Sequence, residues 1–417
     1  MRRRSLNSAH GSLALLTGVA LVAALISANP ASAVSPHAAK VPAKPGTLIV
    51  AKKVASPAVN GTVYLVKYWS ESSPANKPVQ VTGVVIVPRG TTPSGGWPVV
   101  SWAHGTDGMT GLCAESKAAG QDVPSVNTFL AKGWEVTATD YLGEGNPALA
   151  PTTKGLHPYL VATNAARNTI DIVKAARQLK AAHAGSHYVV SGHSEGGQTA
   201  MFALKIAASY APKLHLDGVV ALSPPSQLNG LLAGISGSDY WPFLLMIIGG
   251  FQAAYGNAAD VSQVLTTAGI NLLPSLLGTE CFYSILSSAS AAGGFNAFLK
   301  NPTLPPAWQS LIDQNDPANF TTASSTPLLI VHGDADELIP VSTSATLATQ
   351  LCGLHQDLER WTYPGLDHTG VVDGSSGSDV TTDVVHWITD RFGGAPNPDP
   401  YVPTGNGNYT AETTTCS

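Results

Sequence analysis

The sequence is poor in charged residues and in long apolar runs. Asp, Glu, Lys and Arg make up only 12% of its 417 residues, and the formal net charge at pH 7 is −5. Nucleic-acid binding requires a basic face, and docking on an anionic membrane requires basic clusters, so this composition argues against both. Beyond the first 33 residues, the stretch that comes closest to a membrane span is Tyr240–Phe251, which is too short and ends in Gly249-Gly250.

Cysteine is also scarce. The chain has four, at Cys113, Cys281, Cys352 and Cys416, and none of them forms a C-x-x-C pair. A zinc site is therefore not expected. An even number of cysteines in an exported chain predicts two disulfides, and four cysteines allow three different pairings.

The N-terminal residues have the composition of an export signal rather than of a folded domain. The basic segment Arg2-Arg3-Arg4 precedes the apolar run Leu13–Ile26 and the A-x-A site Ala31-Ser32-Ala33. This pattern predicts that residues 1–33 are a cleavable signal peptide and that the protein is secreted, with an uncleaved N-terminal anchor as the alternative. Residues 34–46 are rich in Ala, Pro and Lys and are predicted to be a disordered lead-in.

Predicted strands and helices alternate along most of the remaining chain. This alternation favours an α/β domain with a mostly parallel central sheet flanked by helices, made of residues 47–225 and 326–392. The alternation breaks within residues 226–325, which are rich in Leu, Ile, Ala and Gly. We predict an inserted helical cap there, with a separate helical domain as the alternative. Residues 393–417 are rich in Pro, Gly, Asn and Thr and are predicted to be an irregular C-terminal tail.

The most informative stretch has an apolar strand, a glycine-rich turn and a helix in direct succession. The strand includes Tyr188-Val189-Val190, the turn reads GHSEGG from Gly192 to Gly197, and the helical pattern follows from Thr199. A G-x-S-x-G pentad in this context is the signature of a nucleophile elbow. Small residues are needed because neighbouring backbones approach the strained turn closely. Ser194 is therefore the predicted nucleophile.

A serine nucleophile needs a base and an acid that orients the base. In this topology the order along the chain is Ser, then Asp or Glu, then His. The loop after the predicted strand 328–331 contains Asp336, which we predict to be the acid, with Asp334 and Glu337 as nearby competitors. The loop after the next predicted strand contains His368, which is the predicted base.

The oxyanion hole requires two backbone amides that point at the developing charge. One is predicted to come from Glu195, the residue that follows the nucleophile. The other is predicted to come from the loop after the strand that ends near His104, with Thr106 preferred and Asp107 as the alternative. His104 itself is predicted to shape this loop rather than to act as a base.

Three further segments have less certain roles. Gly143-Glu144-Gly145 follows a predicted strand end, where ligands gather in open α/β sheets, so it is either near the site or only a turn. His157-Pro158-Tyr159 is predicted to fix the start of a helix. The apolar residues within Trp241–Ile247 either line an acyl pocket or form the core of the cap.

Taken together, these motifs carry a resemblance to a known family. The chain resembles the secreted lipases of the α/β-hydrolase fold found in actinobacteria, which are related to the fungal secretory lipases. The residues that carry the resemblance are Ser101–Thr106, Thr139–Gly145, His157–Val161, the GHSEGGQ elbow, and the loops of Asp336 and His368. The resemblance implies an α/β-hydrolase fold with a helical lid over the acyl pocket. It also suggests the disulfide pairing Cys113–Cys281 and Cys352–Cys416.

The function that this resemblance implies is hydrolysis of carboxylic esters, often acylglycerols, by a secreted serine enzyme. No cofactor and no metal is expected, because the mechanism needs only protein groups and water. The expected partner is a small-molecule ester or lipid, with transient contact to a lipid interface and no obligate protein partner. The alternatives are a small-ester or aromatic esterase, an acyltransferase or a peptidase on the same fold, and a non-catalytic secreted binding protein.

Overall fold

The computed structural model describes residues 43–373, 380–395, 397, 401–403 and 412–416, which belong to one compact unit, Val41–Ser417. The predicted signal peptide, residues 1–33, and residues 34–42 of the predicted lead-in lie outside the described residues. The end of the lead-in is described, and the amide of Gly46 donates to the carbonyl of Trp69 at 2.6 Å.

The core of the fold is one sheet of ten strands among the described residues. Strands β5, β4, β6, β7, β8 and β9 run parallel to one another. Strands β1 to β3 and β10 pair antiparallel at the two sides. In spatial order the strands are β1 (Leu48–Val54), β2 (Thr62–Glu71), β3 (Pro78–Val87), β5 (Glu135–Thr139), β4 (Trp97–Ala103), β6 (Ala184–His193), β7 (His215–Leu222), β8 (Leu328–Gly333), β9 (Leu358–Tyr363) and β10 (Glu412–Cys416).

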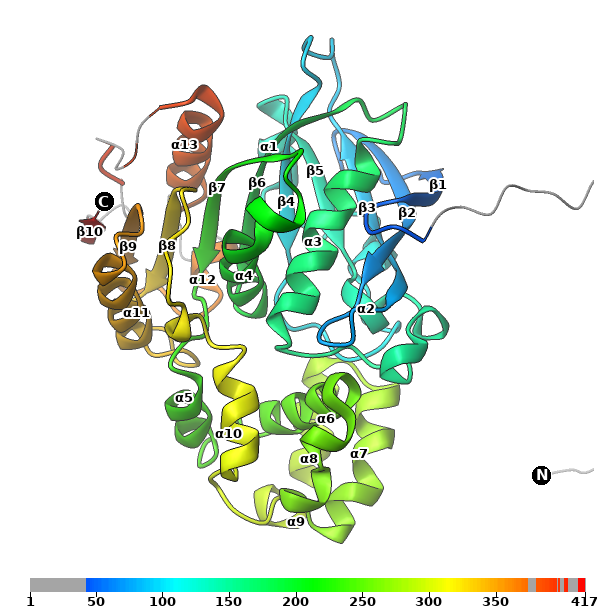
Figure 1. Ribbon diagram of the computed structural model, residues 1–417, viewed down its shortest axis with the longest axis vertical. Helices are drawn as coiled ribbons and strands as arrows, with labels where there is room; N and C mark the ends of the chain where they lie inside the picture. The colour runs from blue at the N-terminus through cyan, green and yellow to red at the C-terminus, as the bar shows by residue number, and fades with distance from the viewer. Residues whose placement is uncertain (1–42, 374–379, 396, 398–400, 404–411, 417) are drawn as a thin grey trace, which may run out of the picture. The chain divides into compact units, whose positions relative to one another are not determined.

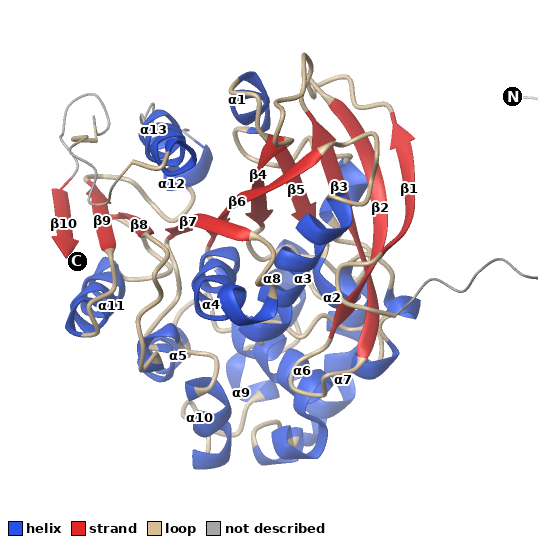
Figure 2. Ribbon diagram, turned by 45° about the horizontal axis from the view of Figure 1, so that its top comes forward, coloured by secondary structure: helices blue, strands red, loops and turns tan. Residues whose placement is uncertain are grey.

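Helices cover both faces of this sheet (Figure 2). One face packs against α3 (Ala162–Ala176), α4 (Glu195–Tyr210) and α11 (Val341–Gly353). The other face packs against α1 (Val126–Ala131), α12 (Gly370–Asp373) and α13 (Val380–Gly393). Because both faces are covered, the central strands are continuous apolar runs, and every residue of β8 is buried. The loops after β4, β6, β8 and β9 leave the sheet at the same edge, since parallel strands end there together.

The region between β7 and β8 is helical. Its helices are α5 (Leu228–Ile235), α6 (Phe243–Tyr255), α7 (Thr267–Thr279), α8 (Phe282–Ala291), α9 (Phe295–Phe298) and α10 (Pro306–Asp313). Figure 1 shows them gathered beyond one end of the sheet. They share an apolar core of their own, which also takes in Met109 and Tyr159 from the sheet domain. The helices therefore pack on the sheet domain through shared side chains.

Two disulfides tie distant segments together. Cys113, in the loop after β4, bonds Cys281 at the start of α8, and Cys352 in α11 bonds Cys416 in β10. This is the pairing that the resemblance suggests. The tail predicted as irregular thus contains a strand: β10 pairs with the outer side of β9 over five residues. Its three threonines are β-branched and favour extended backbone. No helix among the described residues is long and apolar enough to cross a membrane.

Candidate active site

Ser194 occupies a sharp turn between a strand and a helix. Strand β6 ends at His193, and α4 begins at Glu195. The backbone of Ser194 has φ 56° and ψ −118°, a conformation that costs a non-glycine residue roughly 1–3 kcal/mol. The turn is held by its amide, which donates to the carbonyl of Leu222 at 2.9 Å. The local geometry is that of a nucleophile elbow.

The glycines on either side of Ser194 are required by close backbone contacts. A Cβ atom on Gly196 would lie 1.9 Å from the carbonyl oxygen of Ala103. A Cβ atom on Gly192 would lie 2.2 Å from the carbonyl oxygen of Gly196. Both distances are far below van der Waals contact, so a larger residue at Gly196 would push strand β4 from helix α4, and one at Gly192 would push strand β6 from it. The G-x-S-x-G pattern is therefore a packing requirement of this turn.

The three side chains of the predicted triad lie within hydrogen-bond distance of one another. Nε2 of His368 lies 3.0 Å from Oγ of Ser194. Nδ1 of His368 lies 2.9 Å and 3.1 Å from the two carboxylate oxygens of Asp336. An ionised carboxylate can only accept, so the proton of a neutral imidazole lies on Nδ1. Nε2 is then free to accept the proton of the Ser194 hydroxyl.

The carboxylate of Asp336 is buried but well supplied with donors. The amides of Ile339 and Leu338 donate to Oδ1 at 2.8 Å and 3.1 Å. Nε2 of His332 lies 3.2 Å from Oδ2. Burial acts to raise the pKa of Asp336, but the hydrogen bonds from His332 and His368 outweigh it and hold the pKa well below its usual range. The acid facing His368 is therefore ionised at neutral pH.

The two competing acids bond to the backbone of the histidine loop. Oδ1 of Asp334 accepts the amide of Gly365 at 2.6 Å. Oε2 of Glu337 accepts the amide of His368 at 3.1 Å. Neither of these contacts reaches the imidazole ring. Asp334 and Glu337 therefore fix the loop that carries His368, and Asp336 is the carboxylate that contacts its ring.

His193 is a neighbour of the triad that occupies the first variable position of the G-x-S-x-G pentad. Its Nε2 donates to the carbonyl of His368 at 2.8 Å, and the two rings lie 4.7 Å apart. Burial, followed by the nearby His368, lowers the pKa of His193 to about 3. A neutral ring at this position adds no positive charge beside His368. The only sequence signal was its place directly before Ser194.

The predicted oxyanion donors come from two segments near Ser194. Glu195 is the first residue of α4, where a backbone amide has no acceptor within the helix. Thr106 and Asp107 both line the cavity that Ser194 lines. The hydroxyl of Thr106 bonds the hydroxyl of Tyr159 at 2.8 Å, and the carbonyl of Asp107 accepts the amide of Phe282 at 2.9 Å. The loop is thus anchored on both sides.

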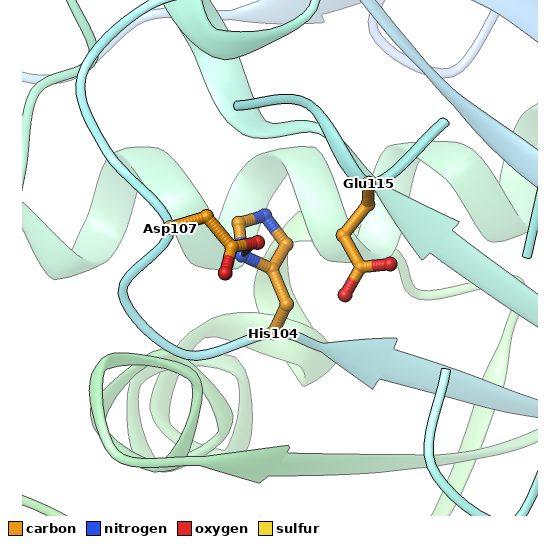
Figure 3. Close-up of side chains that lie close together, drawn as sticks. All are labelled: His104, Asp107 and Glu115. Carbon is orange, nitrogen blue, oxygen red and sulfur yellow. Dashed lines mark ion pairs between the residues drawn. The ribbon is translucent and has the colours of Figure 1, made fainter. Parts of the chain in front are cut away.

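His104, Asp107 and Glu115 lie close together beside this loop (Figure 3). Each offers one ligand atom, and these atoms lie within 4.8 Å of one another. Nδ1 of His104 lies 2.7 Å from the carbonyl of Gly105, which only accepts, so Nδ1 carries a proton and is not available to a metal ion. Its Nε2 lies 3.3 Å from Oε2 of the buried Glu144.

Charge pairing explains this cluster better than metal binding does. Burial alone would lower the pKa of His104, but the Glu144 carboxylate and then Tyr141 and Asp107 raise it well above its usual value. Burial raises the pKa of Glu115 to about 7. We therefore interpret His104 as a buried cation that balances the carboxylates around the oxyanion loop. The predicted role of shaping the loop fits this position, although the carboxylate partners could not be read from the sequence.

Two cavities of different character meet at Ser194. One has a volume of about 490 Å³, and the acidic residues Asp107, Glu115 and Asp122 are among those that line it. The other, of about 40 Å³, is largely apolar, and Phe243 and Ile247 contribute to it. The segment Trp241–Ile247 thus belongs mainly to the core of the cap, with two side chains that also face this cavity.

Comparison with known proteins identifies relatives of this chain. A secreted triacylglycerol lipase of Malassezia furfur is 24% identical over 281 residues, which are 64% of this chain and 56% of the relative. A probable inactive lipase of Mycobacterium tuberculosis is 24% identical over 344 residues, which are 77% of this chain and 72% of the relative. The chain thus spans little more than half the length of the first of these relatives.

A solved structure and a family model also match this chain. The closed state of Candida antarctica lipase A superposes with a TM-score of 0.70 at 17% identity, covering 85% of this chain and 84% of the other. This similarity confirms the predicted α/β-hydrolase fold. The family model described as secretory lipase matches residues 111–399. Since that match covers more than half of the sequence, the chain belongs to the secretory lipase family, as its resemblance predicted.

Proposed function

We propose that this protein is a secreted serine carboxylic-ester hydrolase of lipase type. The observation that supports this most strongly is the position of the His368 ring, which lies 3.0 Å from the hydroxyl of Ser194 and 2.9 Å from the carboxylate of Asp336. The relatives named as lipases, one of them a secreted triacylglycerol lipase, support the reaction class and the extracellular location. The two disulfides also fit an oxidising compartment.

In the first half of the proposed reaction, Oγ of Ser194 attacks the ester carbonyl carbon while Nε2 of His368 takes the hydroxyl proton. The imidazolium that forms faces the ionised Asp336. The carbonyl electron pair moves onto oxygen, where the backbone amides of Glu195 and Thr106 hold it. The tetrahedral intermediate then collapses, the carbon–oxygen bond to the alcohol breaks, and His368 gives its proton to the leaving alkoxide.

In the second half, water hydrolyses the acyl-enzyme. His368 takes a proton from water, the hydroxide attacks the acyl carbonyl, and Ser194 leaves with the proton that His368 returns. No group outside the protein and water is needed. The same chemistry with an alcohol in place of water would give an acyltransferase, which differs in how the site admits the second substrate.

The largely apolar cavity at Ser194, called the narrow cavity below, favours an enzyme with a smaller substrate. Its volume of about 40 Å³ is far smaller than the roughly 490 Å³ of the other cavity at Ser194, so an acyl chain that enters the apolar cavity must be short unless the cap helices move. A short-chain esterase is therefore the second candidate. A non-catalytic binding protein would be expected to lack part of the triad, and here all three side chains are in contact.

The test is a rate series over p-nitrophenyl esters from acetate to palmitate, with Ser194→Ala as the control. We expect hydrolysis by the wild type, a burst of p-nitrophenol, and loss of turnover in Ser194→Ala. A preference for long chains supports the lipase, and a preference for acetate or butyrate supports the esterase. Wild-type turnover in Ser194→Ala would overturn the proposal.

A further inference from the structure

A second imidazole and carboxylate pair lies next to the proposed triad and takes no part in the proposed reaction. His157 and Glu195 are both buried, and Nε2 of His157 lies 2.6 Å from Oε1 of Glu195. From the sequence, His157 is expected only to fix the start of a helix. A short contact between two titratable groups in the interior needs a reason, because burying such groups is costly unless they are paired.

The hydrogen bonds of His157 define where its protons are. Nδ1 lies 3.1 Å from the carbonyl of Leu142, which can only accept, so Nδ1 carries a proton. Nε2 faces the carboxylate of Glu195, and an ionised carboxylate also only accepts. With Glu195 ionised, the ring therefore carries both protons and is an imidazolium. Burial acts to lower the pKa of His157, but Glu144 and Glu195 outweigh it and raise the pKa.

The imidazole ring of His157 is fixed from several sides. The amide of His157 donates to the carbonyl of Met109 at 2.9 Å, which ties the segment to the loop after β4. The ring stacks on Tyr141, with ring centres 5.3 Å apart and planes inclined by 15°. A rigid cation of this kind holds the Glu195 carboxylate in one place.

The position of Glu195 makes its charge important for catalysis. It is the first residue of α4, and its backbone amide is a proposed oxyanion donor. Glu195 is among the residues that line the narrow cavity, as Ser194 is. A negative charge here would repel the oxyanion that forms on the substrate. An acidic residue at this position therefore needs a compensating charge.

We propose that His157 is a positioning residue that neutralises Glu195 and holds its carboxylate away from the developing oxyanion. The inference rests on the proposed function, because it assigns His157 a role in that reaction. His157 acts through Glu195 and does not contact the reacting atoms. The pairing also keeps the first turn of α4, and with it the oxyanion amide, in a fixed position.

Other titratable groups face the pair, and none of them replaces His157. Glu144 and Tyr141 lie on the segment after β5, and Tyr159 bonds Thr106. His104, at the end of β4, pairs with Glu144 at 3.3 Å. Among the described residues, the ion pair of Glu195 is the one with His157. Removal of the imidazolium should therefore leave the carboxylate of Glu195 without a partner cation.

The test compares His157→Gln, Glu195→Gln and the double variant with the full-length wild type on a p-nitrophenyl ester. Glutamine keeps a hydrogen-bond donor near the position of Nε2 but carries no charge. We expect His157→Gln to lower kcat roughly ten- to hundredfold at pH 8 with KM within about twofold, because a buried charge now opposes the oxyanion. Glu195→Gln removes the charge but keeps the backbone amide, so its kcat is the reference against which the double variant is measured.

The double variant separates charge compensation from a merely structural role. With both residues neutral, no charge opposes the oxyanion, so we expect kcat to return to within about threefold of Glu195→Gln. A structural defect in His157→Gln that does not involve the charge of Glu195 would persist in the double variant and keep its kcat low.

Two outcomes would overturn the inference. One is wild-type kcat in His157→Gln at pH 8. The other is a double variant as slow as His157→Gln. If His157→Gln does not fold, Glu195→Gln is compared with the double variant instead. The inference predicts that these two variants have similar kcat. A double variant with much lower kcat than Glu195→Gln would contradict it. Failure of the proposed function would appear separately, as turnover that persists in Ser194→Ala.

Discussion

Replacement of Asp336 by Asn should disable the site through the wrong tautomer of His368. Oδ1 of Asp336 accepts two backbone amides, from Leu338 and Ile339. The oxygen of Asn therefore takes the Oδ1 position, and its NH₂ group takes the Oδ2 position, which lies 2.9 Å from Nδ1 of His368. Two donors cannot face each other at 2.9 Å, and Oδ1, 3.1 Å from Nδ1, is already taken by two amides, so the acceptor form of Nδ1 is favoured.

The proton of a neutral His368 then lies on Nε2, which faces the hydroxyl of Ser194. In that form the ring cannot accept the hydroxyl proton. A change of this kind lowers kcat by roughly 10³- to 10⁴-fold, which corresponds to about 4–5.5 kcal/mol of lost transition-state stabilisation. The midpoint of thermal unfolding should also fall, because Asn lacks the charge that the hydrogen bonds from His332 and His368 stabilise, so kcat is compared at a temperature where both proteins are folded.

The assay is kcat on a p-nitrophenyl ester together with thermal unfolding of the same samples. Glu337→Gln is the matched control, because its amide oxygen still accepts the His368 amide and it does not contact the ring. We expect this control to keep kcat within about threefold of the wild type. Asp336→Asn with more than a tenth of wild-type kcat, or Glu337→Gln with an equal loss, would refute the assignment of the acid.

The two disulfides should differ in their effect on activity. Their sequence separations are 168 for Cys113–Cys281 and 64 for Cys352–Cys416, so replacing either pair by serine should destabilise the fold by roughly 4–5 kcal/mol in the chain-entropy picture. At a temperature where both variants are folded, only the variant without Cys113–Cys281 should have a lower kcat, because this disulfide anchors the oxyanion loop. Equal kcat in the two variants would contradict this. Burial raises the pKa of Glu135 well above its usual value, so the unfolded chain ionises first and Glu135 lowers stability as pH rises above about 4.3. The stability of Glu135→Gln relative to the wild type should therefore be greater at pH 8 than at pH 4.5, and denaturant unfolding of both proteins that shows no such difference would contradict this.

The sequence predicted the parts of the site that depend on local patterns. The turn around Ser194 shows in the sequence because small residues must flank it, and the contacts of Gly196 explain why. Asp336 and His368 could be found because loops after adjacent parallel strands meet at one edge of the sheet. Their contact with each other and with Ser194 follows from that topology.

Other features depend on contacts that no local pattern encodes. His157 meets Glu195, and His193 bonds the carbonyl of His368, across loops whose paths are set by the whole fold. Strand β10 forms because β9 offers an edge and Cys352 a disulfide partner, whereas the composition of the tail indicated only irregular structure. Such pairings need coordinates, since neither partner has a distinctive neighbourhood in the sequence.

The most direct test of the account is to find which residue an active-site phosphonate modifies. Treatment of the wild type with a p-nitrophenyl alkylphosphonate, followed by digestion and mass spectrometry, should place one phosphonyl adduct on Ser194, with loss of esterase activity in proportion to labelling. Ser194→Ala should take up no label, and His368→Gln should label far more slowly, because its serine has lost the base. A stoichiometric adduct on another residue, or full activity in a protein labelled at Ser194, would contradict the account.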